Sequence, residues 1–467
     1  MKDVQRQRWN GLPNAKDRVW GPSLGLLVLC TPVLLWPIAA LAANDVQDVN
    51  QLKAELQSQR QRQAELENKI NQLEARQKLK ERALDQKVEQ VAAQQEKNQG
   101  PKEEGKKKEG AIPEILRWAS RVGLYGDLRY RYEFIDDKSK DFDRNRNRIR
   151  ARLGLNAKIN DEWNLGFRLA TGEGIQEGDP VSTNQTLGGS WGKKPFWLDL
   201  AFLDYHPQWL KGLDILGGKI NVPFYKVGGN QLIWDSDLTP EGGAVSYARP
   251  LNEQTSVNLS AGGFWVVERS TDVDTALWGA QGYVKHQINK PTYILGGVSG
   301  YWYGNLQGEP ALSLQWESPT SNFFGNSNAG GLYDSKYDLF ELFAEAGTSV
   351  RNLPVAVFAD YVVNTAAVND NEDTGWLVGF AINKAKDPGS WQFEYDYREV
   401  KADAVVAQFN DSDFVGGGTA GKGHRFGFTY ALTKNVAPSL TYFADQYWGR
   451  NDDKDYGRLQ ADIVVKF

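Results

Sequence analysis

The sequence predicts an all-β transmembrane protein, an antiparallel β-barrel, and three observations lead to this prediction. First, apolar and polar side chains alternate along many segments, as in LYGDLRYRYEF at residues 124–134, which is typical of a strand with two unlike faces. Second, sixteen such segments follow one another from residue 121 onward. Third, short and long connections alternate between these segments. The mean hydropathy of −0.54 resembles that of a soluble protein, but this index misleads for barrels, where every second strand residue is polar.

The predicted strands are joined by short and long connections in turn. The strands lie near residues 121–135, 144–159, 163–171, 196–206, 213–221, 242–249, 255–268, 274–288, 291–303, 337–350, 353–364, 374–386, 390–401, 422–433, 436–448 and 456–467. Tight turns are expected at 160–162, 289–290, 351–352 and 434–435, and long loops at 172–195, 222–241, 304–336 and 402–420. This alternation is typical of outer-membrane barrels, with short periplasmic turns and long outer loops. A soluble sandwich and a secreted solenoid are the alternatives.

The first 42 residues have the pattern of a signal peptide. Basic residues precede the apolar run LGLLVLCTPVLLWPIAALA, which ends in the small-residue pattern Ala40-Leu41-Ala42. A retained membrane anchor is the alternative. Cleavage would remove Cys30, the chain's single cysteine, so we expect no disulfide, no thiolate metal site and no haem attachment. An exported protein follows from this interpretation.

Residues 43–99 differ from the rest of the chain. Apolar residues recur there with three- and four-residue spacing, and Gly and Pro are absent from 45–99, a pattern that predicts a coiled coil. A single solvated helix is the alternative. Residues 100–120 form a charged, Gly-containing linker. The predicted order is therefore a signal peptide at 1–42, a periplasmic coiled coil at 43–99, a linker at 100–120 and a transmembrane barrel at 121–467.

Arginines occupy the polar face of the first three predicted strands. The candidate pore-lining residues are Arg129, Arg131, Arg144, Arg146, Arg148, Arg150, Arg152 and Arg168. Carboxylates stand on the inward faces of neighbouring strands: Asp127 and Glu133 on the first strand and Asp199 on the fourth. A slip of one residue would turn the arginines toward lipid at roughly 2–4 kcal/mol each near the midplane, so the register should be strongly fixed. Either these charges line water or they pair to stiffen the wall.

The barrel segment resembles the bacterial "putative porin" family of outer-membrane channels. The resemblance rests on GDLRYRYE, NRIRARLGL, WLDLAFLDYHP, GGKINVPFY, LIWDSDLTPEGGAVSY, YDLFELFAEAG, FADYVVN, DAVVAQFNDSDF and KGHRFGFTYALTKN, in this order from about residue 122 to 467. The end LQADIVVKF resembles the assembly signal of such proteins. The resemblance also implies that the third outer loop, 222–241, folds inward, so we expect Asp235, Asp237 and Glu241 to face the arginines as a constriction.

Other classes of function have little support. The chain has three histidines, His206, His286 and His424, and none has a pattern that indicates catalysis, so we expect no enzyme. The acidic stretches 136–143, 403–413 and 451–455 fit no dedicated metal-ligand spacing, and we interpret them as solvated loops. No cofactor is expected. A net charge of −5 gives no support for nucleic-acid binding.

The function predicted from the sequence is passive diffusion of small hydrophilic solutes or ions through a water-filled lumen in the outer membrane. Expected partners are the outer-membrane lipid, further copies in a homotrimer, and the peptidoglycan. The alternative is a structural tether, in which the coiled coil trimerises and links the barrel to the cell wall. Anion and cation selectivity both stay open, because the inward arginines and the acidic loops favour opposite signs.

Overall fold

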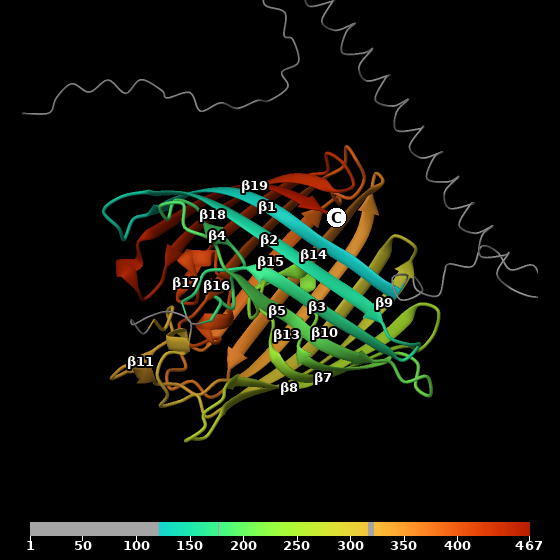
Figure 1. Ribbon diagram of the computed structural model, residues 1–467, viewed down its shortest axis with the longest axis horizontal. Coiled ribbons are helices and arrows are strands. Elements are labelled where there is room, and N and C mark those ends of the chain that lie inside the picture. The colour runs from blue at the N-terminus through green and yellow to red at the C-terminus, as the bar shows by residue number, and fades with distance from the viewer. Residues whose placement is uncertain (1–120, 176, 316–321) are drawn as a thin grey trace, which may run out of the picture. The chain divides into compact units, whose positions relative to one another are not determined.

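A closed antiparallel β-barrel makes up the part of the chain that the computed structural model describes, which is residues 121–467 without 176 and 316–321 (Figure 1). Sixteen strands form the wall. Each pairs with the next one in the wall, and the last strand closes the barrel against the first, from Asp127↔Lys466 to Asp137↔Tyr456. Closure leaves no strand edge unpaired, as a spanning sheet requires.

The wall strands are β1 (Val122–Asp137), β2 (Arg144–Lys158), β3 (Trp163–Thr171), β5 (Phe196–Tyr205), β6 (Leu213–Lys219), β7 (Glu241–Pro250), β8 (Thr255–Val267), β9 (Thr275–Asn289), β10 (Thr292–Gly304), β13 (Asp338–Val350), β14 (Leu353–Asn364), β15 (Thr374–Ile382), β16 (Trp391–Val400), β17 (Gly421–Tyr430), β18 (Val436–Tyr447) and β19 (Asp455–Lys466). The loops carry β4 (Gln185–Thr186), β11 (Asn328–Ala329), β12 (Leu332–Tyr333), η3 (Val227–Gly229), η4 (Leu312–Gln315), η5 (Ala407–Phe409), η6 (Phe414–Gly416) and η7 (Asn451–Asp453). Among the described residues, no helix has the length and apolar character needed to span a membrane.

The predicted number and order of strands are confirmed, with two boundaries corrected. The strand expected at 374–386 ends at Ile382, because Asn383 takes a left-handed conformation with φ 64° that extended backbone does not allow. The strand expected at 422–433 ends at Tyr430, because the turn to β18 spans 431–435 rather than 434–435 alone. The predicted signal peptide, coiled coil and linker lie outside the described residues.

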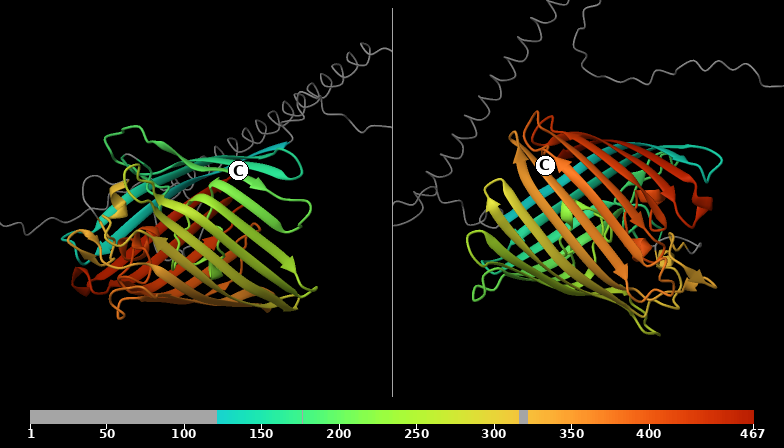
Figure 2. Two further views of the ribbon diagram at one scale, coloured as in Figure 1. Left: turned by 90° about the horizontal axis from the view of Figure 1, so that it is seen from below. Right: turned by 180° about the vertical axis from the view of Figure 1, so that it is seen from behind.

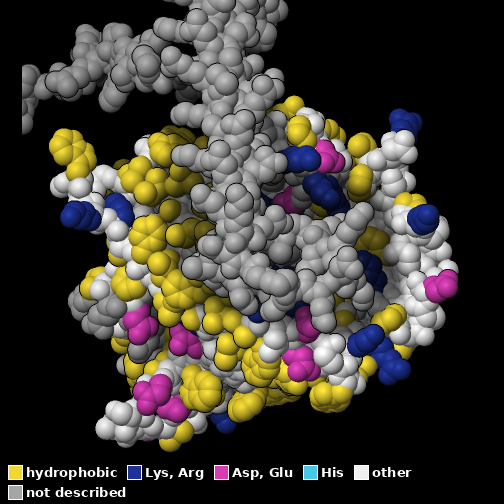
Figure 3. Space-filling view, turned by 45° about the vertical axis from the view of Figure 1, so that its right-hand side comes forward, with side chains coloured by type: hydrophobic (Ala, Val, Ile, Leu, Met, Phe, Trp, Pro, Cys, Tyr) yellow, Lys and Arg dark blue, Asp and Glu magenta, His cyan; other side chains and the backbone are white. Residues whose placement is uncertain are grey.

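The outer surface of the barrel is apolar. Alternation turns Leu128 and Leu203 outward with about half of each side chain exposed, and hydrophobic side chains cover the flank to the left in Figure 3. Trp265, Trp278 and Trp302 are exposed near the end that carries the long loops. Exposed tryptophans at one height of an apolar wall are typical of the level of the lipid headgroups.

The two ends of the barrel differ in their connections. Four long loops, residues 172–195, 220–240, 305–337 and 401–420, lie at one end, here called the long-loop end. Short connections such as 351–352 lie at the other, the short-turn end, where β1 begins and β19 ends (Figure 2). Outer-membrane barrels place their short turns in the periplasm.

Three of the long loops fold into the barrel and bury apolar side chains there. We call this cluster the loop core; its main members are Ile220, Phe224, Val227, Leu232, Trp234, Leu306, Leu312, Tyr333, Val405 and Phe414. Loops 220–240, 305–337 and 401–420 all contribute to it, and it packs on Tyr301 and Tyr303 of β10. At about 25 cal/mol per Å² of apolar surface removed from water, this packing fixes loops that would otherwise be mobile.

Candidate functional site

The predicted arginines of β1 and β2 lie opposite one another on the inner face of the wall. Arg129 pairs in register with Arg150, and Arg131 with Arg148. Between them on β1, Tyr130 points outward with 46% of its surface exposed, whereas Arg131 is 6% exposed. Like charges directly opposite each other in a sheet repel, so this arrangement requires carboxylates within reach.

The carboxylates of β1 supply part of this compensation. Asp127 accepts hydrogen bonds from the Nε atoms of Arg150 at 2.8 Å and Arg152 at 2.7 Å. The fully buried Glu133 forms ion pairs with Arg146 and, at 2.7 Å, with Arg458 of β19. Charge-assisted bonds of this kind are the strong ones in a protein interior.

The remaining predicted arginines have different surroundings. Arg131 donates from Nε and a terminal nitrogen to both oxygens of Asp462 on β19, at 2.7 and 2.8 Å. Arg168 of β3 forms an ion pair with Asp199 of β5. Arg144, at the long-loop end of β2, is exposed and has no ion pair within the described residues.

Arg129 differs from its neighbours because its described contacts include no carboxylate within ion-pair distance. It donates to Asn184 of loop 172–195, while its Nε atom is buried without a partner in the described part of the chain. Arg148 reaches the same loop through a bond to Ser182 at 3.3 Å, and it also lies 3.8 Å from Glu133 and 3.9 Å from Glu173. Within the described residues, the guanidinium group of Arg129 is therefore held by a neutral amide and not by a carboxylate.

Loop 220–240 brings one of the predicted acidic residues to these arginines. Asp237 lies 3.7 Å from Arg152 and 4.0 Å from Arg150, and it accepts bonds from the amide and hydroxyl of Thr183 at 3.1 and 2.9 Å. Burial by itself would raise the pKa of Asp237, but the charges of Arg150 and Arg129 outweigh it and lower that pKa below its usual range. Asp237 is therefore a carboxylate held in its charged form.

Asp235 joins two loops instead of facing the arginines. Its backbone amide donates to the carbonyl of Phe409 at 2.8 Å, and its carboxylate accepts from the amides of Asp237 at 2.7 Å and Ser412 at 2.9 Å. Burial, with the charges of Asp237 and Asp411, raises the pKa of Asp235 well above its ordinary value. We call this contact between loops 220–240 and 401–420 the loop clasp.

The structure does not bring Glu241 to the arginines. Glu241 is the first residue of β7, and its carboxylate lies 2.8 Å from Lys219 on β6. Glu241 therefore forms an ion pair with a residue of the neighbouring strand and is not part of the inward loop. The expectation for this residue is corrected, because the strand begins one residue earlier than the alternation suggested.

Sequence reasoning missed the second acidic loop. The stretch 403–413, interpreted as solvated, is buried: Asp403 is 1% and Asp411 0% exposed. Asp411 lies 2.7 Å from Arg398, while Asp413 lies 2.7 Å from Arg458 and 3.4 Å from Arg131. Alternation in β19 places Arg458, Gln460 and Asp462 on one face, and this signal could have indicated a charged partner for the loop.

The opposite inner wall carries carboxylates that hold loop 220–240. Glu345 of β13 accepts from the hydroxyl of Tyr225 at 3.0 Å and from the amide of Gly228 at 2.9 Å. Asp360 of β14 accepts from Asn230 at 2.8 Å. The loop is thus attached to one wall and presents Asp237 to the other, with the loop core filling the space on the side of β10, β13 and β14.

A cavity of about 830 Å³ opens beside the arginines at the long-loop end. Arg144, Arg146, Arg148 and Arg458 line one part of it, and residues 416–418 of loop 401–420 line another. A cavity of this volume has room for many water molecules. The space left open by the loops therefore adjoins the charged wall.

A closed sixteen-stranded barrel with an apolar exterior, a charged inner wall and an open cavity beside that wall has the architecture of a transmembrane channel. The chain belongs to the family described as "Putative porin", which matches residues 136–330 and 336–467. It is an outer-membrane channel of the porin type, as the sequence resemblance implied.

Several solved structures are also similar to this chain. One is Pseudomonas putida OprB, with 13% identity and a TM-score of 0.49, covering 75% of this chain and 95% of that one. Another is Salmonella typhi OmpF in complex with daunomycin, with 14% identity and a TM-score of 0.44, covering 74% and 97%. A Rhodopseudomonas blastica porin mutant has 9% identity and a TM-score of 0.40, covering 74% and 100%. No curated protein matches the chain.

Proposed function

We propose that this porin is a passive diffusion channel whose water path runs along the arginine wall of β1–β3, beside the place where the inward loop 220–240 touches that wall. The observation that carries the proposal is Asp237, a loop carboxylate within 4.0 Å of Arg150 and Arg152 on the wall. Opposite charges at the edge of a narrow passage create a local field, which orients and filters small polar solutes and ions. No covalent step and no energy input are involved.

Planar-bilayer recording of the purified protein, with the reversal potential taken across a salt gradient, tests the proposal. We expect discrete conductance steps. Replacing Arg148 and Arg150 by Ser should lower the anion-to-cation permeability ratio, and Asp237→Asn should raise it. Arg249→Ser, at an exposed position near the short-turn end of β7, serves as the control. An unchanged ratio in both the arginine and the aspartate variants would contradict the proposal.

A structural tether remains a second hypothesis, and it concerns residues 43–99. We propose that this segment trimerises as a periplasmic coiled coil and contacts the peptidoglycan, while the barrel conducts. Deleting residues 45–110 should leave single-channel conductance intact and weaken the trimer or the attachment to the cell wall. Loss of conductance in a folded deletion variant would contradict this division between the two segments.

A further inference from the structure

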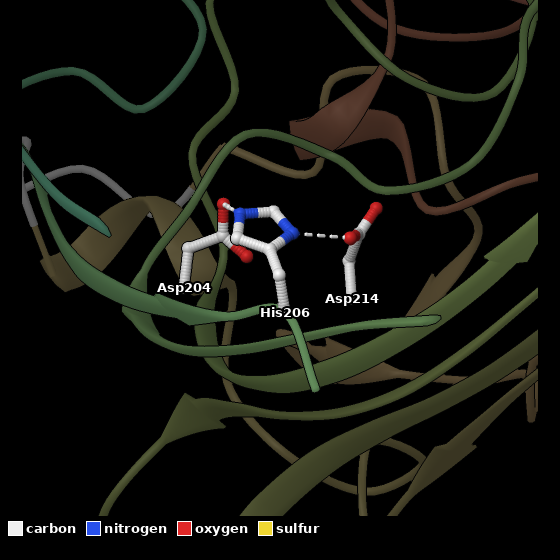
Figure 4. A group of neighbouring side chains, drawn as sticks. All are labelled: Asp204, His206 and Asp214. Carbon is white, nitrogen blue, oxygen red and sulfur yellow. Dashed lines mark hydrogen bonds and ion pairs between the residues drawn. The ribbon is translucent and has the colours of Figure 1, made fainter. Parts of the chain in front are cut away.

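Three side chains converge where β5 turns into β6 at the short-turn end. The imidazole of His206 lies between the carboxylates of Asp204 and Asp214 (Figure 4). Its Nε2 atom is 2.9 Å from Asp204 Oδ2, and its Nδ1 atom is 2.5 Å from Asp214 Oδ1. Donor atoms, one from each residue, lie within 4.8 Å of one another.

A neutral imidazole of His206 cannot donate a hydrogen bond to both Asp204 and Asp214. A neutral imidazole carries a single N–H, and carboxylates only accept. If Nδ1–H donates to Asp214, the Nε2 lone pair faces an oxygen of Asp204 at 2.9 Å. The amide nitrogen of Asn164 lies 2.7 Å from Nε2 and also hydrogen-bonds the Asp204 carboxylate, but one amide cannot remove the repulsion between the Nε2 lone pair and Asp204 Oδ2. A cation between Nε2 and Asp204 would remove the repulsion.

Asp204 has further capacity to bind a cation. Its Oδ1 atom is buried and has no hydrogen-bond partner within the described residues. The side chains of Asp204, His206 and Asp214 are 18%, 34% and 44% exposed, so an ion can reach them from water. Because Leu203 points outward, alternation places Asp204 on the inner face, at the mouth of the lumen.

The other two histidines lack such surroundings. Nδ1 of His286 lies 3.0 Å from the hydroxyl of Thr255, and Nδ1 of His424 lies 2.9 Å from the hydroxyl of Tyr395. Neither has a carboxylate partner within the described part of the chain. His206 is thus the one histidine of three placed among carboxylates.

We propose that Asp204 and His206 bind a divalent transition-metal ion of the zinc type at the short-turn mouth, with Asp214 orienting the imidazole. One imidazole nitrogen and carboxylate oxygens are ligands that zinc accepts at about 2.0–2.2 Å, and ligating histidines typically donate their other N–H to a carboxylate. Calcium and magnesium prefer sites made of oxygen alone. Water completes the coordination, so the site exchanges its ion, and the bound ion ties the end of β5 to the turn before β6.

Zinc titration of the folded, chelator-treated full-length protein tests the proposal. Calorimetry is run in excess Mg²⁺, which occupies sites made only of carboxylates. We expect one saturable Zn²⁺ per chain, and His206→Ala should lower the affinity by about tenfold or more. His286→Ala, at the same end of the barrel, is the matched control and should bind as the wild type does. Absence of saturable binding, or equal binding in the two histidine variants, would overturn the proposal.

A second variant keeps the test decisive if His206→Ala does not fold. Asp204→Asn keeps the shape of the side chain and removes its charge, and we expect the same loss of affinity. Heat modifiability on gels verifies that each variant is a folded barrel. Zinc affinity unchanged in a folded Asp204→Asn protein would also overturn the proposal. Because the readout is binding, this result is independent of whether the barrel conducts.

Discussion

At the scale of single residues, Asp413 holds together arginines from the two strands that close the barrel. It contacts Arg131 of β1 and Arg458 of β19, although it belongs to loop 401–420. Removing one partner of a buried ion pair leaves the other charge uncompensated, which costs about 3–5 kcal/mol. Asp413 thus joins the loop to the closure of the wall.

We predict that Asp413→Asn destabilises the folded protein by about 3 kcal/mol at neutral pH. The measurement is the urea or heat transition of the purified barrel, followed by its gel mobility. Asp370→Asn, in an exposed part of the β14–β15 loop, is the matched control and should leave the transition unchanged. Equal transitions for the two variants would show that the pair contributes little.

Acid should weaken the same contact. Burial would raise the pKa of Asp413, but the charges of Arg458 and Arg131 lower it far below its ordinary value. At a pH between the pKa of Asp413 in the folded protein and its ordinary pKa, the unfolded chain binds a proton that the folded protein does not. The contribution of Asp413 to stability is therefore present above about pH 4 and is lost as the pH falls below it.

Asp235 should show the opposite dependence on pH. Its pKa is raised by burial and by Asp237 and Asp411, so the folded protein holds the proton more tightly than the unfolded chain does. The contribution of Asp235 to stability is therefore largest below its ordinary pKa of about 4 and declines as the pH rises through the raised value. We predict that Asp235→Asn flattens this decline, as measured by heat-modification temperatures from pH 4 to 8. An identical pH profile for the variant and the wild type would contradict the assignment.

At the scale of elements, Gly228 fixes loop 220–240 against the wall. Its φ is +58°, and an added Cβ would meet the ring of Phe358 on β14 at 2.4 Å. The neighbouring Gly229 has a similar φ of +65° but nothing within 4 Å of an added Cβ. Both glycines therefore need a left-handed backbone, but only Gly228 packs against a side chain.

We predict that Gly228→Ala releases the loop, while Gly229→Ala does so to a lesser degree. Both variants pay about 1–2 kcal/mol for a left-handed alanine, and only the first also displaces Phe358. Single-channel recording should show a larger or noisier conductance for Gly228→Ala than for Gly229→Ala. The same recording from both would mean that the contact with Phe358 does not hold the loop.

Strands were predictable from the sequence, whereas loop contacts were not. Alternation locates β1 and β2 to within two residues because a period of two is a local property of the chain. The partners of Asp413 and Asp235 lie up to 282 residues away in the sequence, and no local pattern encodes such distances. The family resemblance predicted that Asp237 and Glu241 would both face the arginines. Asp237 does so, but β7 begins one residue earlier than predicted, and Glu241 therefore belongs to the strand and not to the loop.

At the scale of the whole molecule, the barrel closes through its last residue. Phe467 and Gly126 exchange two backbone hydrogen bonds of 3.1 Å. The phenyl ring lies over Gly126, where an added Cβ would meet it at 2.5 Å. Phe467 therefore stabilises the seam between β1 and β19 through two backbone hydrogen bonds and through the packing of its ring on Gly126.

We predict that deleting Phe467 destabilises the closed barrel by about 2 kcal/mol, since each lost hydrogen bond contributes about 1 kcal/mol. Heat modifiability of the purified protein measures the effect. Phe142→Ala, an exposed phenylalanine in the connection between β1 and β2, is the control for the loss of an aromatic side chain. A transition as high as that of the control would show that the seam does not depend on its terminal residue.

The wall of the barrel and the loop core inside it meet different solvents. Lipid surrounds the wall, while the loop core borders the water of the lumen. Urea acts through water, so it should loosen the loop core at concentrations that the lipid-embedded wall withstands. We therefore expect the loop core to melt and re-form inside a wall that stays folded, as a small soluble protein would inside a rigid container.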